Sequence, residues 1–375
     1  METWSTHHLY KKAKHKFSLE IVSDIQKKYN ALQNSNLPVI FTLRHLSKII
    51  DTDYEFLHNS VNRQLESSNY RLFSITKRSG GKRFIHSVSK KLIVLHKYIN
   101  SQILQMVPPH HCCYAFHSKG GIKKCANSHC GCNWLLQFDL KDFFYSISEC
   151  DVYLLFRKLG YKSLLSFELA RLCTTLHLPK SHSNYIKIGN SRSDHDKFFI
   201  SPQTQFPYNY VSKIGVLPQG APASPMLSNL IAFDLDVALY SFAQEFGFVY
   251  SRYADDISFS STVLPKGKSL GKLRNIIVSI IRRNGFIENS SKIRIAGPGA
   301  RKEVLGLVVD GEQPRISKFL FKRIDRALYA AKKFGLKNVA DHDGFDSVYG
   351  FYNHLAGLMA YIKDVHYGNV LVLPK

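Results

Sequence analysis

Two adjacent acidic residues interrupt an apolar stretch in the C-terminal half of the chain. Asp255 and Asp256 follow FVYSRYA and precede ISFSS, so they occupy a tight turn between two strand-like runs. Neighbouring carboxylates resist joint ionisation, and a divalent cation with oxygen ligands such as Mg²⁺ removes that cost. A solvated hairpin turn is the alternative interpretation, because Asp is common in turns.

A third acid favours the metal-site interpretation. Asp139 ends the apolar run WLLQF, where a charged group is costly unless it is paired or binds a metal. Carboxylates at the ends of two strands are suited to holding two metal ions for in-line phosphoryl or nucleotidyl transfer. The sequence therefore predicts that Asp139, Asp255 and Asp256 are the catalytic residues and the magnesium ligands.

The charge of the chain indicates a polyanionic partner. Its 375 residues include 51 Lys and Arg against 28 Asp and Glu, a formal net charge of +23. Such an excess points to nucleic acid or an anionic membrane surface. No run of about 18 apolar residues is present, and the N-terminus lacks a signal-peptide core. Seven cysteines, an odd number, fit a reducing compartment. We therefore expect a cytoplasmic protein that binds nucleic acid and not a membrane.

The hydrophobic pattern predicts an α+β protein with a helical C-terminal unit. Alternating runs flank a basic Gly-Gly turn and predict a β-hairpin over 70–88. Residues 178–213 are polar and aperiodic, which indicates either a functional insertion or a mobile segment. The other expected strands lie near 134–139, 248–261 and 292–311, and helices are expected within 1–60 (broken at Pro38) and over 92–106, 149–160, 163–176, 226–246, 268–284, 317–334 and 344–363.

Six motifs in order make the chain similar to reverse transcriptases, and among them to the bacterial retron reverse transcriptases. They span about 70–310 and read YRLFSITKRSGGKRFI, FDLKDFF, LPQGAPASP, YADD, GFIENSSK and VLGLVV. The resemblance implies a right-hand polymerase fold, with fingers, a palm built on an antiparallel sheet with helices, and a helical thumb. It divides the chain into an N-terminal helical region (1–66), fingers and palm (67–310) and an RNA-binding thumb (311–375).

The resemblance also assigns the nucleotide contacts. Phe144, five residues after Asp139, matches the steric gate that excludes a ribose 2′-OH, whereas Phe143 and Tyr145 are open to an ordinary role as core aromatics. Gln219 matches a residue that lines the nucleotide pocket.

Glycine and basic residues complete this predicted pocket. Gly220 allows the backbone to approach closely. Lys77, Arg83 and Lys292 would face the triphosphate of a dNTP, although any one of them is open to being a solvated charge.

Two retron-specific signals are present, each with a substitution. The family pattern Asn-Ala-x-x-His reads Cys-Ala-Asn-Ser-His over 125–129, and Val-Thr-Gly reads Val-Leu-Gly over 304–306.

Five cysteines lie within 21 residues beside four histidines, but no C-x-x-C pair occurs, which argues against a zinc site. We interpret the thiols as buried and the histidines, including His129, as surface residues that help to bind RNA.

A basic stripe follows in the predicted thumb. Lys318, Lys322, Arg326 and Lys333 share one face of the expected helix, which predicts a grip on RNA phosphates, with a solvated face as the alternative.

The function implied by the resemblance is RNA-directed DNA polymerisation with two Mg²⁺ ions. A retron enzyme copies part of its own structured non-coding RNA from an RNA 2′-OH primer and makes a branched RNA–DNA product, msDNA. The resemblance further implies antiphage defence with a separate effector protein. Two alternatives stay open: an abortive-infection type reverse transcriptase that makes untemplated DNA, and a catalytically silent RNA-binding scaffold, which the intact site residues disfavour.

Overall fold

The chain divides into two compact units, which are described separately. The computed structural model describes residues 18–76, 80–187, 207–265, 267 and 269–367. The first unit comprises residues 1–111, 141–235 and 284–286, and the second comprises residues 112–140, 236–283 and 287–375.

The first unit is mainly helical. Polar caps start several of its helices: the Ser148 side chain accepts from the Asp151 backbone N–H, and the Asp151 carboxylate accepts from the Ser148 N–H in return. A two-stranded antiparallel hairpin pairs Tyr70 with Val88 at its base. Its elements are α2 (Leu19–Asn34), α3 (Leu43–Ile49), α4 (Tyr54–Val61), α5 (Glu66–Asn69), β1 (Tyr70–Thr76), β2 (Lys82–Val88), α6 (Lys90–Tyr98), η1 (Ile99–Ile103), η2 (Leu104–Met106), α8 (Glu149–Lys158), α9 (Ser163–Cys173), η3 (Lys180–Tyr185), η5 (Pro207–Tyr210) and α10 (Ser224–Ile231).

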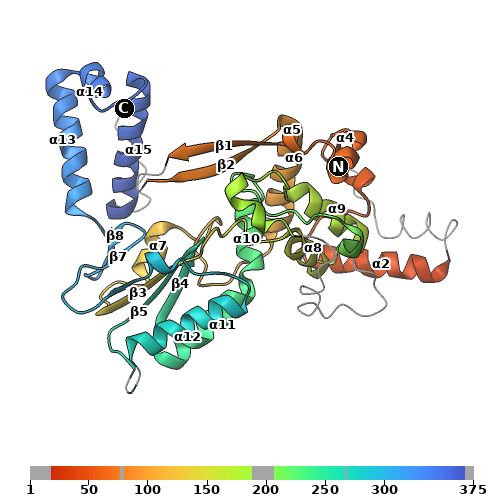
Figure 1. Cartoon of the computed structure of the whole chain (residues 1–375), viewed down its shortest axis with the longest axis horizontal. Helices are drawn as coiled ribbons and strands as arrows, with labels where there is room; N and C mark the ends of the chain where they lie inside the picture. Colours follow the sequence, from red (N-terminus) through yellow and green to blue (C-terminus); the bar gives the residue numbers. More distant parts are fainter. Residues whose placement is uncertain (1–17, 77–79, 188–206, 266, 268, 368–375) are drawn as a thin grey trace. The chain divides into compact units, whose positions relative to one another are not determined.

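The second unit is built on a four-stranded antiparallel sheet. The strand order is β4-β5-β3-β6, so β5 and β3 are the interior strands. Phe242 of α11 contacts Phe259 of β5 at a ring-centroid distance of 5.6 Å, and α11 and α12 lie along the same side of the sheet (Figure 1). The elements are α7 (Ile122–Asn127), β3 (Trp134–Asp139), α11 (Phe233–Phe246, which begins in the first unit), β4 (Val249–Tyr253), β5 (Asp256–Ser261), α12 (Leu270–Arg283), η6 (Ser290–Lys292) and β6 (Arg294–Ala296).

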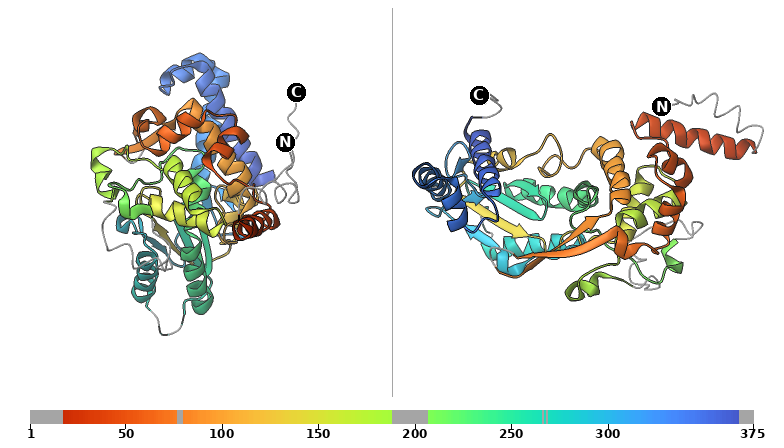
Figure 2. Two further views of the ribbon diagram at one scale, coloured as in Figure 1. Left: turned by 90° about the vertical axis from the view of Figure 1, so that its right-hand side faces the viewer. Right: turned by 90° about the horizontal axis from the view of Figure 1, so that it is seen from above.

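A small sheet and three helices complete the second unit. The helices form a bundle of their own, in which α13 and α15 lie side by side (Figures 1 and 2), around the buried side chains of Val339, Ala340, Phe351 and Leu355. The elements are β7 (Glu303–Val304), β8 (Leu307–Val308), β9 (Arg315–Ile316), α13 (Lys318–Phe334), α14 (Leu336–His342) and α15 (Val348–Tyr367).

The expected α+β class, antiparallel sheet and helical C-terminal region are confirmed. Three details differ from the expectation: the helix expected over 92–106 passes into π and 3-10 turns after Tyr98, the helix expected over 226–246 is broken into α10 and α11, and the additional helix α14 precedes α15. The central part of the polar segment, 188–206, lies outside the described residues, as do residues 1–17.

No single helix in the described ranges is long and apolar enough to cross a membrane. The pair α10 and α11, bent by 49°, passes by length and composition alone.

Candidate active site

The three predicted acids converge where two interior strands of the second unit end. Asp139 is the last residue of β3 and Asp256 the first of β5, and the two are register partners. Tyr253 of β4 is also a partner of Asp256, which leaves Ala254 and Asp255 as a two-residue turn. The backbone N–H of Leu140 donates to the Asp255 carbonyl at 2.9 Å. Sheet pairing and this turn therefore bring together acids that are more than a hundred residues apart in sequence.

The crowding of these acids is visible in their electrostatics. Desolvation of the carboxyl group, and then the negative charges of Asp255 and Asp139, raise the pKa of Asp256 to about 6, although the residue keeps solvent exposure. Lys292, the last residue of η6, opposes this shift. Its Nζ donates to Asp139 Oδ2 at 2.7 Å, while its side chain stays 57% exposed. The site holds more negative charge than one ammonium group balances.

The donor set fits a hard divalent cation. Carboxylate oxygens are the ligands that Mg²⁺ prefers, and three of them at one edge create the charge that such an ion neutralises. In the described ranges, one group of at least three His, Cys, Asp or Glu side chains has all its ligand atoms within 4.8 Å of one another, and that group lies elsewhere. The carboxylate oxygens of the three acids are therefore spaced more widely than this. In this arrangement the ammonium of Lys292 is the cation that Asp139 contacts.

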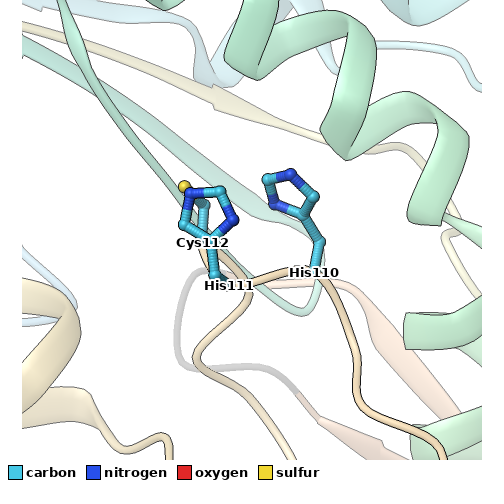
Figure 3. A group of neighbouring side chains, drawn as sticks. All are labelled: His110, His111 and Cys112. Atoms are coloured by element: carbon cyan, nitrogen blue, oxygen red, sulfur yellow. The ribbon is translucent and has the colours of Figure 1, made fainter.

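That other group consists of three consecutive residues, His110, His111 and Cys112 (Figure 3), whose ligand atoms lie within 4.8 Å of one another. They lie where the chain passes from the first unit to the second. Structural zinc sites take four ligands, and this group supplies three. Most thiols of the 112–132 segment are buried, as expected, with Cys130 partly exposed.

The prediction that His129 is a surface residue that binds RNA is wrong. Its side chain is 1% exposed and lies between two hydroxyl groups, with Nδ1 2.6 Å from Ser260 Oγ and Nε2 2.6 Å from Ser251 Oγ. Burial lowers the pKa of His129 to about 4, so the imidazole is neutral and links β4 to β5. Cys125, at the first position of the same motif, contacts Ser251 Oγ through its sulfur at 3.3 Å.

Two buried charged residues behind the acidic turn were not predicted from the sequence. Arg252 and Asp236 are both fully buried and form an ion pair with 2.6 Å between Nη2 and Oδ2. A sequence signal was available for one of them. Arg252 stands inside the strand VYSRY, and a guanidinium in a buried strand requires a charged partner.

The predicted nucleotide contacts on the motif FDLKDFFY belong to the first unit. Phe143 and Tyr145 are 3% and 5% exposed, and Phe143 packs on Phe286 at 5.7 Å between ring centroids. Phe144 is half-buried. Of the three aromatic residues, Phe144 is thus the most exposed.

The loop LPQG is held against the hairpin within the same unit. The backbone N–H of His86 donates to the Gln219 carbonyl at 2.8 Å. Gly220 has a φ of 114°, and a Cβ there would lie 2.6 Å from the His86 carbonyl oxygen, so this approach requires glycine. Gln219 is half-buried and Arg83, on β2, is exposed. Lys77 lies outside the described residues.

The basic stripe on α13 is exposed along its length, and an aromatic residue lies within it. Lys318, Lys322, Arg326 and Lys333 are all exposed. Tyr329 is 62% exposed, and Lys333 Nζ lies 5.8 Å from the centroid of its ring. Tyr329 was not among the residues predicted from the sequence, although its helical position places it on the same face as the four cations.

Comparison with known proteins identifies the family. The family model described as reverse transcriptase (RNA-dependent DNA polymerase) matches residues 75–309. The chain is 30% identical over 295 residues to the retron Ec86 reverse transcriptase of Escherichia coli, covering 78% of this chain and 79% of that protein. It is 29% identical over 280 residues to the retron Mx162 reverse transcriptase of Myxococcus xanthus, covering 71% of this chain and 53% of that protein.

Among solved structures, a telomerase from Candida albicans in complex with a fragment of telomeric RNA matches with a TM-score of 0.36 and 11% identity, over 83% of this chain and 58% of that one. The assignment rests on the sequence matches. Reverse transcriptases copy an RNA template from dNTPs and use divalent metal ions. The chain belongs to the reverse transcriptase (RNA-dependent DNA polymerase) family and, within it, to the retron reverse transcriptases.

Proposed function

We propose that this enzyme reverse transcribes part of its own structured non-coding RNA, starts from an RNA 2′-OH and makes the branched RNA–DNA hybrid msDNA. The likeness to retron enzymes over most of the chain supports this proposal. The same likeness supports a role in antiphage defence, in the cytoplasm and with a separate effector protein.

The observation that carries the catalytic part of the proposal is the pairing of Asp139 with Asp256 beside the Asp255 turn. These three acids would hold two Mg²⁺ ions. When bound, the ions supply electrostatic stabilisation of the phosphoryl group being transferred. The chain itself contributes the fixed positions of the carboxylates, because each lies at the end or turn of a paired strand.

Lys292 would change partner when the site is loaded. Its ammonium contacts Asp139 at 2.7 Å and its side chain is largely exposed, so a cation at Asp139 frees it to face the dNTP triphosphate. By the family resemblance, Arg83 and Lys77 would also contact dNTP phosphates, where a guanidinium binds oxygens bidentately.

The first-unit residues would select and hold the nucleotide. The half-buried residue Phe144 would exclude a ribose 2′-OH, and Gln219 and Gly220 would line the pocket.

In the second unit, residues 311–375 would serve as the thumb. The basic stripe on α13 would contact RNA phosphates, and Tyr329 would be available to stack on a base.

Asp255→Asn tests the catalytic assignment. We expect extension of an RNA template to fall at least ~10³-fold, because a positioned metal supplies several kcal/mol of transition-state stabilisation. RNA affinity and melting temperature should stay near wild type. Asp341→Asn, which removes an exposed acid of α14, is the control and should extend normally. An Asp255→Asn enzyme that extends at the wild-type rate would show that the site is assigned wrongly.

The product distinguishes the retron function from its alternatives. RNA that co-purifies with the enzyme is sequenced together with the DNA made on it, before and after treatment with a debranching enzyme. We expect DNA complementary to part of that RNA, joined through a 2′–5′ linkage. DNA without a template match would indicate the untemplated activity instead.

A further inference from the structure

We infer that Arg252 is a positioning residue, which holds the turn carrying Asp255 and Asp256 in the shape that binds metal. The inference rests on the proposed function of these acids. It follows from the contacts of a buried guanidinium that reaches from strand β4 to the turn itself.

The guanidinium joins three parts of the second unit. Arg252 Nε and Nη2 donate to Oδ1 and Oδ2 of Asp236 on α11, each at 2.6 Å. Tyr250 donates its hydroxyl to the same Asp236 Oδ1 at 2.6 Å. The remaining nitrogen, Nη1, donates to the carbonyl oxygen of Ala254 at 3.1 Å. Helix, strand and turn are thereby fixed by one side chain.

The turn needs such a restraint because its first residue is strained. Ala254 has a φ of 57°, in the left-handed region that is unfavourable for a residue with a Cβ. The next two residues are Asp255 and Asp256. If the Ala254 peptide relaxed, both carboxylates would move with it. Strain of this kind persists only where the surroundings over-determine the backbone.

The backbone of Arg252 is itself fixed on both sides. Its N–H donates to the Cys112 carbonyl at 2.9 Å, and its carbonyl accepts from the Tyr114 N–H at 2.9 Å. On the other side it pairs with Ile257 of β5. The guanidinium therefore projects from a strand that is bonded along both edges, which makes it a rigid support.

The role is geometric rather than electrostatic. The bidentate pair with Asp236 balances the charge of Arg252 within the protein. A lysine would keep that charge but has a single side-chain nitrogen. It is therefore unable to bind both carboxylate oxygens of Asp236 and the Ala254 carbonyl at the same time.

Arg252→Lys tests the inference through metal binding as well as activity. Supporting residues around a metal site typically contribute about 10–100-fold to metal affinity or activity. We expect the Mg²⁺ concentration that gives half-maximal extension to rise about 10-fold. Mn²⁺ titration of the nucleic-acid-free protein, followed by EPR, should show weaker binding in the same proportion. RNA affinity should stay within about 2-fold, because the stripe on α13 is unchanged.

Arg63→Lys is the matched control. Arg63 is an arginine of the first unit whose side chain is 8% exposed, and it is paired with Glu149 at 2.6 Å and bonded to Thr174. Its replacement should lower the melting temperature and leave the Mg²⁺ half-saturation unchanged. Adding Ala254→Gly to Arg252→Lys should recover up to about 5-fold, because glycine removes the strain that Arg252 restrains.

An Arg252→Lys protein with wild-type Mg²⁺ and Mn²⁺ dependence overturns the inference. Should that protein fail to fold, Tyr250→Phe removes only one bond to Asp236 and is measured in its place. A smaller rise in half-saturating Mg²⁺ is expected there, and a wild-type value again overturns the inference. The proposed function fails separately, through an active Asp255→Asn enzyme.

Discussion

Lys292 donates to Asp139 across 2.7 Å, although 153 residues separate them in sequence. The proposed phosphate ligand and a proposed metal ligand therefore neutralise each other when neither ligand is bound. A cation and the lysine compete for one carboxylate oxygen, and this competition has a measurable consequence.

Lys292→Ala should bind Mn²⁺ more tightly than wild type and polymerise less efficiently. An ion pair with one exposed partner, here Lys292, contributes about 0.2–1 kcal/mol, so removing the competitor should tighten Mn²⁺ binding by about 1.4- to 5-fold. The KM for dNTPs should rise, because the variant has one cation fewer to face the triphosphate. EPR titration and steady-state kinetics measure the two effects. Equal Mn²⁺ affinity in both proteins would rule out the competition.

Asp256 should make the stability of the metal-free protein depend on pH. Its pKa is raised from 3.8 to about 6. At a pH between these two values, Asp256 is therefore protonated in the folded state and ionised in the unfolded state. This contribution to stability is therefore lost as the pH rises from about 4 to about 6.

Asp256→Asn removes that titration. We expect its melting temperature in EDTA to exceed that of wild type at about pH 8, with the difference closing towards about pH 4. Asp325→Asn removes an exposed acid of α13 and should give a difference that does not vary with pH in this way. A pH-independent difference for Asp256→Asn would contradict the crowding of the three acids.

Phe144→Ala should admit ribonucleotides. The half-buried ring is proposed to occupy the space of a 2′-OH, so the preference for dGTP over rGTP should fall by on the order of 10-fold or more. Single-nucleotide incorporation on a primed RNA measures the ratio. Phe143→Leu, a change in a buried ring, should lower stability without altering that ratio. An active Phe144→Ala enzyme with unchanged selectivity would place the gate at Phe143 or Tyr145.

Neutralising the four basic residues of α13 together should weaken RNA binding and its dependence on salt. Each cation that no longer neutralises an RNA phosphate should reduce the slope of log affinity against log salt by roughly 0.7–0.9. Extension of a saturating primer–template should survive. A control variant neutralises four exposed cations elsewhere in the second unit, namely Lys119, Lys272, Arg274 and Arg283. If the α13 variant keeps the wild-type slope, its stripe is a solvated face.

Local signals account for what the sequence predicted well. Asp139 and Asp256 lie at strand ends that apolar runs and a tight turn reveal, and most helix ranges follow from the hydrophobic pattern. The burial of His129 has no local signal, because Ser251 and Ser260, its two partners, come from strands 122 and 131 residues away. The histidine pattern alone favoured a polar surface role.

The Arg252–Asp236 pair was missed for a related reason. The two residues are 16 apart, on a strand and a helix that pack only in the folded unit. A charged residue in a buried strand indicates that a partner exists without indicating which one. The π-helical turn at Ile99–Ile103 likewise has no sequence signature that we recognised.

The two strands that end in acids are the interior strands of the β4-β5-β3-β6 sheet. Interior strands open last, since their amides exchange with solvent only when neighbouring strands on both sides separate. The carboxylates of Asp139 and Asp256 are thus attached to the part of the second unit that is least subject to fraying. On heating, metal binding should disappear together with the slowest-exchanging amides of β3 and β5, in one cooperative step and not ahead of it.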